Sequence, residues 1–154
     1  MVAFLLFIND IHGRGLKAAQ GLLLIESFYW DMDDNTRAFA KRFGARPGMN
    51  GKAPNGNQAG VYASTRAYLN AVATAASDDA KDVVPQMKTF KGKDELFGDT
   101  AIRQDGRVIH PIYLFEVKKP EESKYPYDYD KLIVTIPADQ AFRPMNEGHC
   151  PLVE

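Results

Sequence analysis

Cysteine is almost absent from this sequence of 154 residues: the only one is Cys150, close to the C-terminal end. A single thiol cannot form a disulfide within the chain or a zinc site made of cysteines. We interpret Cys150 as an unpaired thiol in the tail. The alternative is a partner cysteine on another chain or on a segment outside this sequence.

Clusters of basic residues are also lacking. The 19 Lys and Arg residues are balanced by 20 Asp and Glu residues, which gives a net charge of -1 at pH 7, and no Lys/Arg run is longer than a pair such as Lys118-Lys119. Proteins that bind nucleic acid usually carry a basic face, so we expect no nucleic-acid partner. The shares of apolar residues (45%) and charged residues (25%) are typical of a globular domain with a packed core.

Long apolar runs are missing as well. The first run, at residues 2–8, is ended by Asn9-Asp10 and is far shorter than the roughly 20 residues that span a bilayer. No basic residues precede it, as they would in a signal peptide. For the sequence as written, we therefore expect a chain that stays in the cytoplasm.

The first part of the sequence predicts alternating strands and helices. We expect a buried strand at 4–8, a short helix at 11–20 and a second strand at 22–25. Together they suggest a strand–helix–strand unit with parallel strands. A helix follows at 33–43, where Asp33 can cap the first turn.

The middle of the sequence predicts a loop and two helices. Residues 45–57 are rich in Gly, Pro and Asn and are expected to form the loop. The strongest helix prediction covers 58–76, because apolar residues recur there at steps of three and four. These residues are Val61, Tyr62, Thr65, Tyr68, Leu69, Val72 and Ala75. Another helix is expected at 79–90, with a kink or a late start at Pro85.

The last third predicts strands and a tail. Asp105-Gly106 between apolar flanks predicts a two-residue hairpin turn. A long strand is expected at 108–117, with an edge or a bulge at Pro111, and a last strand at 132–136. The remainder is expected to be an extended tail. The tyrosines that we expect to anchor it over the surface are Tyr125, Tyr127 and Tyr129.

The stretch FINDIHGRG at 7–15 places Asp-x-His-Gly after an apolar run and resembles the first metal-binding motif of the calcineurin-like metallophosphoesterases. A two-metal site needs several carboxylate, His and Asn ligands. The sequence has only three histidines and lacks the later Gly-Asn-His and Gly-His-x-His blocks of that family. The ligand count argues against this enzyme class. We interpret Asp10 as a helix cap and His12 as a turn or helix-start residue.

Several segments occur in an order that points to another family. They are Ala18-Ala-Gln-Gly21, Phe28-Tyr-Trp-Asp31, the helix at 33–43, Gly60-Val-Tyr-Ala-Ser64 and the hairpin at 98–107. In this order they resemble the C-terminal part of an ABC-transporter substrate-binding protein. The resemblance is to periplasmic binding protein type I, in its branched-chain amino acid (leucine/isoleucine/valine) receptor-like branch.

The resemblance implies two α/β lobes that are joined by three crossovers and hold a small-molecule ligand in a cleft. It implies no catalysis, no cofactor and no bound metal. The Tyr-rich tail ending in Cys150-Pro-Leu152 resembles a subgroup thought to bind aromatic acids, so an amino acid or an aromatic acid is the expected ligand. Family members are periplasmic, carry a signal peptide that this sequence lacks, and hand their ligand to an ABC permease.

We expect the chain to form a partial fold of this type: a parallel sheet flanked by helices, with a C-terminal hairpin and an extended tail. The expected division is an α/β ligand-binding-protein fragment at 1–118 and a Tyr/Pro-rich extension at 119–154. Within the fragment we expect the end of one lobe at 1–25, a crossover at 26–32, segments that complete the other lobe at 33–95, and a return hairpin and strand at 96–118.

The family lines its cleft from strand ends and crossovers, which implies six ligand-binding positions. They are Asn9, Asp10, Phe28, Tyr29, Trp30 and Tyr62. The polar side chains could hydrogen-bond a ligand, and the rings could stack on its apolar part. Alternatives stay open: Asp10 as a cap, the crossover aromatics as packing residues, and Tyr62 in the core.

Strands 4–8 and 22–25 would have neighbours that this sequence does not encode. Because unpaired apolar strands favour pairing with another copy, we expect a homo-oligomer. Two alternatives to solute binding remain: the metal-dependent phosphoesterase, and a fragment that oligomerises without binding a ligand.

Overall fold

The computed structural model describes residues 2–3, 5–149 and 151, and the chain divides into two compact units. Unit 1 comprises Met1–Ala59 and Ile112–Ile136; unit 2 comprises Gly60–Pro111 and Pro137–Glu154. The stretch 26–32, which we expected to cross between lobes, lies within unit 1. The chain instead leaves and re-enters unit 1 after Ala59, Pro111 and Ile136.

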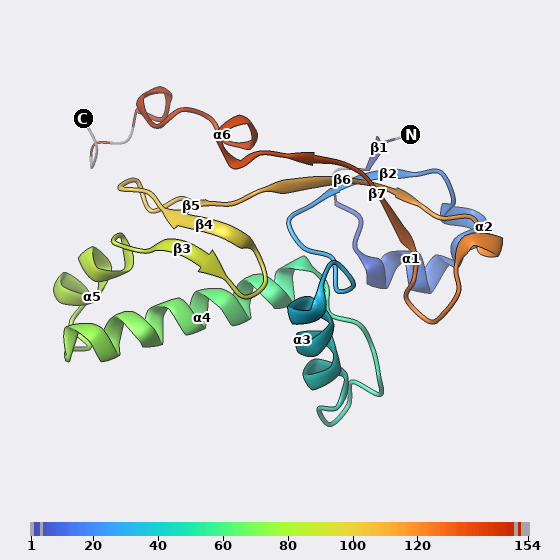
Figure 1. Ribbon diagram of the computed structural model, residues 1–154, viewed down its shortest axis with the longest axis horizontal. Coiled ribbons are helices and arrows are strands. Elements are labelled where there is room, and N and C mark those ends of the chain that lie inside the picture. Colours follow the sequence, from blue (N-terminus) through green and yellow to red (C-terminus); the bar gives the residue numbers. More distant parts are fainter. Residues whose placement is uncertain (1, 4, 150, 152–154) are drawn as a thin grey trace. The chain divides into compact units, whose positions relative to one another are not determined.

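The sheet of unit 1 has four strands in the order β1-β2-β6-β7 (Figure 1). β1 (Val2–Ala3) and β2 (Leu23–Glu26) are parallel, whereas β6 (Ile112–Val117) is antiparallel to both β2 and β7 (Asp130–Ile136). The predicted α/β class is confirmed. The sheet does begin with a parallel pair, but its first strand is β1 and not the predicted strand at 4–8. The sheet as a whole is mixed, because β6 and β7 enter from much later in the sequence.

The prediction of a strand at 4–8 is wrong. Residues 5–7 are irregular and α1 (Ile8–Arg14) begins at Ile8; Phe4 lies outside the described residues. The backbone N–H of Phe7 donates to the carboxylate of Asp10 at 2.9 Å, which stabilises the first turn of the helix. Ile8 and Ile11 are buried three residues apart, so the end of the apolar run forms a helix face.

The helix predicted at 11–20 is two helices, α1 and α2 (Leu16–Ala19), separated by Gly15. Gly15 has a φ of 81°, a left-handed value that residues with a β-carbon rarely adopt. Both helices contribute to the core of unit 1. Its buried members are Ile8, Ile11, Ala19, Leu24, Tyr29, Ala53, Phe115, Val117 and Tyr127.

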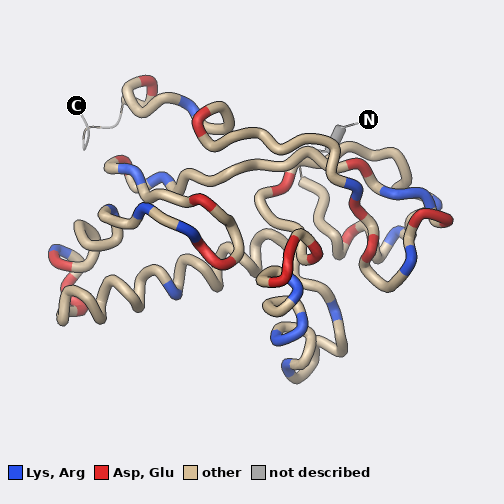
Figure 2. Tube along the Cα trace, viewed as in Figure 1, with Lys and Arg blue, Asp and Glu red and all other residues tan. Residues whose placement is uncertain are grey.

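The prediction for α3 (Asp34–Gly44) is confirmed, including its cap. Asp33 accepts from the N–H of Thr36 at 2.9 Å, and the hydroxyl of Thr36 accepts from the N–H of Asp33 at 3.0 Å. Acidic residues begin the helix, and Lys41 and Arg42 lie in its last turn (Figure 2). This order matches the helix dipole.

α4 (Gly56–Ala75) starts two residues before the predicted helix, because Asn55 and Gln58 cap it reciprocally. The predicted apolar stripe is not its buried face: Val61, Tyr68 and Leu69 are exposed. The buried positions are occupied by the small residues Ala59 and Ala71. Over the part of the chain that is described, no helix is long and apolar enough to cross a membrane.

Unit 2 continues with α5 (Ala80–Met87), whose N-terminus is capped by Asp79 and which contains Pro85. A three-stranded antiparallel sheet follows, with β3 (Lys91–Asp94), β4 (Gly98–Ile102) and β5 (Val108–Ile109). Its polar strand β3 was not predicted.

The β4–β5 hairpin is confirmed, but its turn has three residues. Arg103 N–H donates to the carbonyl of Arg107, and Gly106 N–H donates to the carbonyl of Arg103, both at 2.9 Å. Gly106 has a φ of 81°, the left-handed conformation that such a turn needs at its last position.

The single strand predicted at 108–117 is wrong. His110 and Pro111 interrupt it, and β5 and β6 belong to different sheets. Proline lacks the N–H that would continue the ladder.

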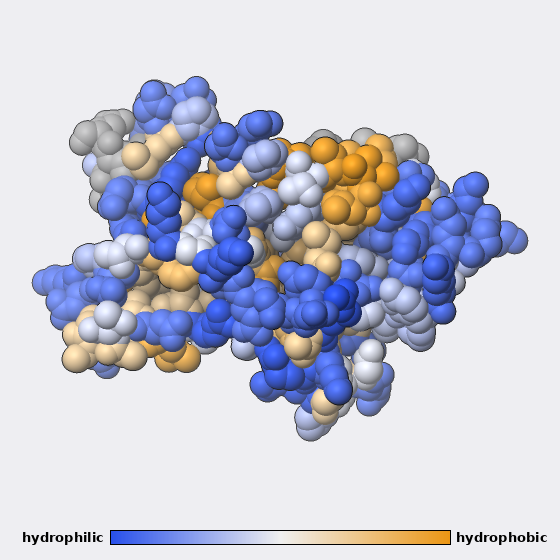
Figure 3. Space-filling view, in the orientation of Figure 1, coloured by the Kyte–Doolittle hydropathy of each residue, from blue (hydrophilic) through white to orange (hydrophobic). Residues whose placement is uncertain are grey.

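The stretch 119–154, expected as an extension, contributes a strand to the sheet of unit 1. β7 starts two residues before the predicted strand, and its pairing with β6 shifts register between Leu114 and Phe115. Figure 3 shows apolar side chains gathered over the part of the sheet that contains β6 and β7. The short helices η1 (Pro120–Glu122), α6 (Ala138–Ala141) and η2 (Met145–Glu147) complete the order. Cys150 lies outside the described residues.

Candidate functional site

Polar side chains gather at the carboxyl end of the parallel strands of unit 1. Asn9 lies in the first turn of α1, after β1, and Glu26 is the last residue of β2. Nδ2 of Asn55 donates to Oδ1 of Asn9 at 3.0 Å. Ligand sites of α/β proteins commonly lie at this edge of a sheet. We call Asn9, Glu26, Asn55 and Gly56 the strand-end cluster.

Glu26 packs tightly against the first residue of α4. A β-carbon at Gly56 would lie only 2.8 Å from Oε2 of Glu26. The position therefore has to be glycine as long as the carboxyl group stays where it is. Burial, and secondarily the negative charge of Asp130, raises the pKa of Glu26 to about 8. This carboxyl group is largely protonated at pH 7.

Asp10 is near this cluster in sequence but has a structural role. Its carboxylate accepts from the backbone N–H of Phe7, as described above. Asp10 therefore stabilises the first turn from the third position of α1, whereas we expected it to be the N-cap residue itself; that position is held by Phe7. In this arrangement Asp10 holds the turn that carries Asn9.

Two of the predicted aromatic residues are packed in the interior. Phe28 is buried, and its ring meets that of Phe39 edge to face with centroids 6.0 Å apart. Tyr29 is buried against Phe115 at 5.4 Å. Because both side chains are buried, Phe28 and Tyr29 are better explained as packing residues than as residues that contact a ligand.

The side chains of Tyr29 and Trp30 donate hydrogen bonds to the same backbone carbonyl group. The hydroxyl of Tyr29 and Nε1 of Trp30 both donate to the carbonyl of Tyr127, at 3.0 and 2.9 Å. The same hydroxyl accepts from the N–H groups of Tyr129 and Asp130, at 3.2 and 3.4 Å. The tyrosine side chain thus fixes the backbone at the start of β7.

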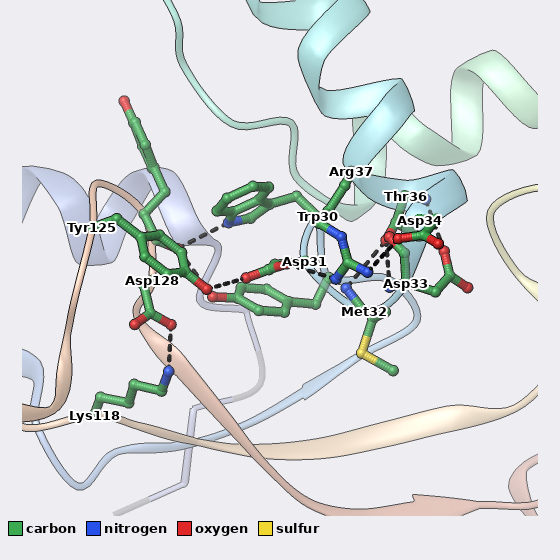
Figure 4. Close-up of polar contacts among 12 residues, drawn as sticks. Trp30, Asp31, Met32, Asp33, Asp34, Thr36, Arg37, Lys118, Tyr125 and Asp128 are labelled. Atoms are coloured by element: carbon green, nitrogen blue, oxygen red, sulfur yellow. Dashed lines mark hydrogen bonds and ion pairs between the residues drawn. The ribbon is translucent and has the colours of Figure 1, made fainter.

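Side chains of the segment 118–130 strengthen this attachment (Figure 4). The hydroxyl of Tyr125 donates to Asp31 at 2.5 Å, and Arg37 pairs with the other oxygen of Asp31 at 3.0 Å. Lys118 pairs with Asp128, which also accepts from the N–H of Lys124. The expectation that Tyr125 lies on the surface agrees with its exposure, whereas Tyr127 is buried.

His12 faces the same segment. Its ring stacks on Tyr127 with centroids 4.5 Å apart, and its Nδ1 lies 2.8 Å from the hydroxyl of Tyr129. His12 and Asp10 therefore contact protein groups, and in the described part of the chain no three His, Cys, Asp or Glu side chains gather as a metal site. The metallophosphoesterase interpretation gains no support.

Asp130 is a second acidic group in the interior of unit 1. It is 6% exposed, and its Oδ1 has no hydrogen-bond partner among the described residues. Burial, opposed by Lys118 and reinforced by Asp128, raises the pKa of Asp130 to about 7. A buried carboxylate without a partner is unfavourable, so the protonated form is preferred at low pH.

Tyr62, the sixth predicted position, belongs to unit 2. The guanidinium of Arg66 lies over its ring, 5.7 Å from the centroid. The same Arg66 pairs with Asp94 and Glu95. Tyr62 is half-buried rather than part of a core.

Glu26, Asn55 and Gly56 were missed by the sequence-based prediction. A signal for Glu26 existed: it is the first charged residue after the apolar run at 22–25, just as Asn9 is the first polar residue after 2–8. Asn55 and Gly56 come from a distant loop, and only the fold brings them to this edge.

Comparisons with known proteins give a consistent result. A family model described as periplasmic binding protein matches residues 1–124. A crystal structure of a periplasmic binding protein from Burkholderia mallei is 45% identical, with a TM-score of 0.92 over 99% of this chain and 40% of that one. A branched-chain amino acid ABC transporter periplasmic ligand-binding protein from Burkholderia xenovorans is 40% identical, with a TM-score of 0.89 over 100% of this chain and 40% of that one.

A more distant structure shares the fold. The solute-binding protein of an ABC transporter from Rhodopseudomonas palustris, in complex with p-hydroxybenzoic acid, is 18% identical, with a TM-score of 0.69 over 89% of this chain and 37% of that one. No curated protein matches the sequence. The chain spans about 40% of the length of the two Burkholderia proteins.

The buried Asp130 predicts a pH-dependent stability. Its pKa is 3.8 in the reference state and about 7 in the folded chain, so folding takes up a proton between these values. The contribution of Asp130 to stability is greatest at acidic pH and falls, on the order of 4 kcal/mol, as the pH rises from about 4 to about 7. We expect Asp130→Asn to lose this part of the pH dependence, measured as the difference in the free energy of urea unfolding between pH 5 and pH 8. The exposed Asp99→Asn is the control; equal slopes in Asp130→Asn and wild type would contradict the assignment.

Removal of the Tyr29 hydroxyl group should lower the stability of the fold by a measurable amount. Tyr29→Phe leaves buried backbone groups of residues 127, 129 and 130 without this partner. We expect a loss of about 1–3 kcal/mol in the free energy of unfolding. Trp30, the only tryptophan, reports unfolding by fluorescence. The exposed Tyr68→Phe serves as the matched control, and equal stability of both variants would show that the hydroxyl of Tyr29 contributes nothing.

Proposed function

The chain belongs to the periplasmic binding protein family, and we propose that it supplies a small-molecule-binding surface in an ABC-type uptake system. It binds solute and does not catalyse a reaction. The observation that carries this proposal is the 45% identity to a periplasmic binding protein across 99% of the chain. The strand-end cluster of unit 1 offers a physical location for the ligand.

The proposed ligand is a branched-chain amino acid or an aromatic acid. One relative is named as a branched-chain amino acid ligand-binding protein, and a more distant one is in complex with p-hydroxybenzoic acid. Both ligand classes combine a charged end with an apolar body. Amide groups such as that of Asn9 suit the polar end of either class.

The predicted site residues receive different roles in this proposal. Asn9 contacts the ligand directly, and Asp10 positions it by stabilising the first turn of α1. Phe28, Tyr29 and Trp30 stabilise unit 1 through packing and hydrogen bonds and do not contact the ligand in this proposal. Tyr62, half-buried under Arg66, belongs to unit 2 and is not part of the strand-end cluster of unit 1.

The partner and compartment follow from the family. We propose that ligand release is directed to an ABC permease and that the protein acts in the periplasm. Two solved relatives, at 45% and 40% identity, are periplasmic proteins, which supports the compartment.

Ligand binding is tested by thermal shift and by the fluorescence of Trp30. L-Leucine or 4-hydroxybenzoate at 100 times its Kd should stabilise the chain by about 2.7 kcal/mol. Asn9→Ala should weaken binding roughly 3- to 10-fold, because one neutral hydrogen bond is lost. Asn70→Ala, at an exposed position of α4, is the control. A wild-type chain that responds to neither compound at millimolar concentration contradicts the proposal.

The exposed apolar edge strand β7 favours self-association of the chain. β7 is an edge strand, and Leu132, Ile133 and Val134 are 44%, 46% and 47% exposed. An apolar edge strand favours pairing with another chain. We therefore propose that the chain forms a homo-oligomer through β7.

Sedimentation velocity tests this second proposal. The wild-type chain should sediment as a dimer or larger species, and Ile133→Lys should shift it to monomer, because a charge on the edge opposes pairing. Val61→Lys, an exposed apolar position of α4, should leave the assembly unchanged. A monodisperse wild-type monomer would refute association through β7.

A further inference from the structure

The two faces of the sheet of unit 1 have different surroundings. On one face, Leu24 of β2 and Phe115 of β6 are register partners, and both are buried. They belong to the same core cluster as Ile8 and Ile11 of α1 and Ala19 of α2. The helices α1 and α2 therefore cover this face.

The opposite face carries a row of apolar side chains across three strands. Ile25 of β2 is the register partner of Leu114 of β6, and Leu114 is the partner of Val134 of β7. Because successive residues of a strand alternate between the two faces, this row lies on the side away from Phe115. Ile25 and Val134 are 49% and 47% exposed, although β2 is an inner strand of the sheet.

We call this side of the sheet the open face. Its apolar residues continue along the strands on both sides of the row, and none of them is buried. They are Leu23, Ile25, Ile112, Leu114, Val134 and Ile136. Figure 3 shows apolar side chains gathered over the part of the sheet that contains β6 and β7.

The open face also carries two charged residues of opposite sign. Glu116 of β6 and Lys131 of β7 are register partners, and opposite charges placed across a strand pair attract each other. The charged end of the face is therefore balanced within the chain. A partner that covers the open face needs an apolar surface and no net charge of either sign.

The arrangement of the strands indicates which kind of element fits this face. β1 and β2 are parallel, and parallel strands occur mostly in sheets that are covered by helices on both faces. α1 and α2 supply the helices of one face. The exposure of Ile25 and Val134 means that, over the described residues, the open face is without such a layer.

The Burkholderia mallei protein indicates where helices for this layer come from. It shares the fold at 45% identity over 99% of this chain, but the match covers only 40% of its own length. Most of that protein is therefore chain that this sequence does not match. We propose that the open face is the docking surface for a helical polypeptide equivalent to this unmatched part, whose apolar side chains pack on Ile25, Leu114 and Val134.

Co-expression with the unmatched part of the Burkholderia mallei protein tests docking on the full chain. The chain carries an affinity tag, and the unmatched part is produced as a separate, untagged polypeptide. We expect the two to copurify without added ligand and to sediment as a 1:1 complex. Docking goes beyond the proposed solute binding and is measured independently of it.

Two variants place a charge within the apolar row. Ile25→Lys and Val134→Lys should each reduce the amount of copurified partner at least tenfold, because burying an unpaired charge is unfavourable. Both positions are about half exposed, so the chain itself should keep its fold. Urea unfolding followed by the fluorescence of Trp30 checks this.

Thr135→Lys is the matched control. Thr135 follows Val134 on β7 and is exposed, but its side chain points to the opposite face. The same charge at this position should leave copurification unchanged.

Two results would overturn the docking proposal. One is a partner that does not copurify with the wild-type chain, or that copurifies equally with all the variants. The other is a wild-type homodimer that Ile25→Lys dissociates while no partner copurifies, because a second copy then covers the open face. A missing response to L-leucine would count against solute binding and would leave the docking result as it stands.

Discussion

The hydroxyl group of Tyr29 joins parts of unit 1 that are far apart in the sequence. It donates to the carbonyl of Tyr127, 98 positions later, and accepts from the two N–H groups that follow. Because β7 starts at Asp130, these bonds decide where the last strand enters the sheet. β7 pairs with β6, and β6 pairs with β2, whose last residue is Glu26. The geometry of the strand-end cluster therefore depends on a contact outside it.

Burial in the sheet of unit 1 explains the raised pKa values of two acidic groups. Glu26 and Asp130 both lie in the sheet of unit 1, and burial raises the pKa of Glu26 to about 8 and that of Asp130 to about 7. In a purely structural interior, apolar residues would stabilise the fold more.

Local features were predictable from the sequence. Asp33 caps α3, Asp79 caps α5, and Asp105-Gly106 lies in the β4–β5 turn, because each depends on neighbours within a few residues. The family resemblance, which rested on the order of several segments, is confirmed by the comparisons. Predictions from hydrophobic periodicity alone were wrong where tertiary contacts determine which residues are buried. The end of the first apolar run became a helix face, and the apolar stripe of α4 stays exposed while its alanines are buried. For the candidate site, the position of Asn9 after an apolar run singled it out in the sequence, whereas Asn55 and Gly56 are brought to this edge only by the fold; the binding role of each stays a prediction.

The central claim is that a ligand binds at the strand-end cluster. Amide chemical-shift mapping by NMR, with L-leucine added to the isotope-labelled chain, tests it most directly. The largest shifts should fall on Asn9, Glu26, Asn55 and Gly56, and the β4–β5 hairpin of unit 2 should be unaffected. Shifts confined to other residues, or spectra unchanged at saturating ligand, would contradict it.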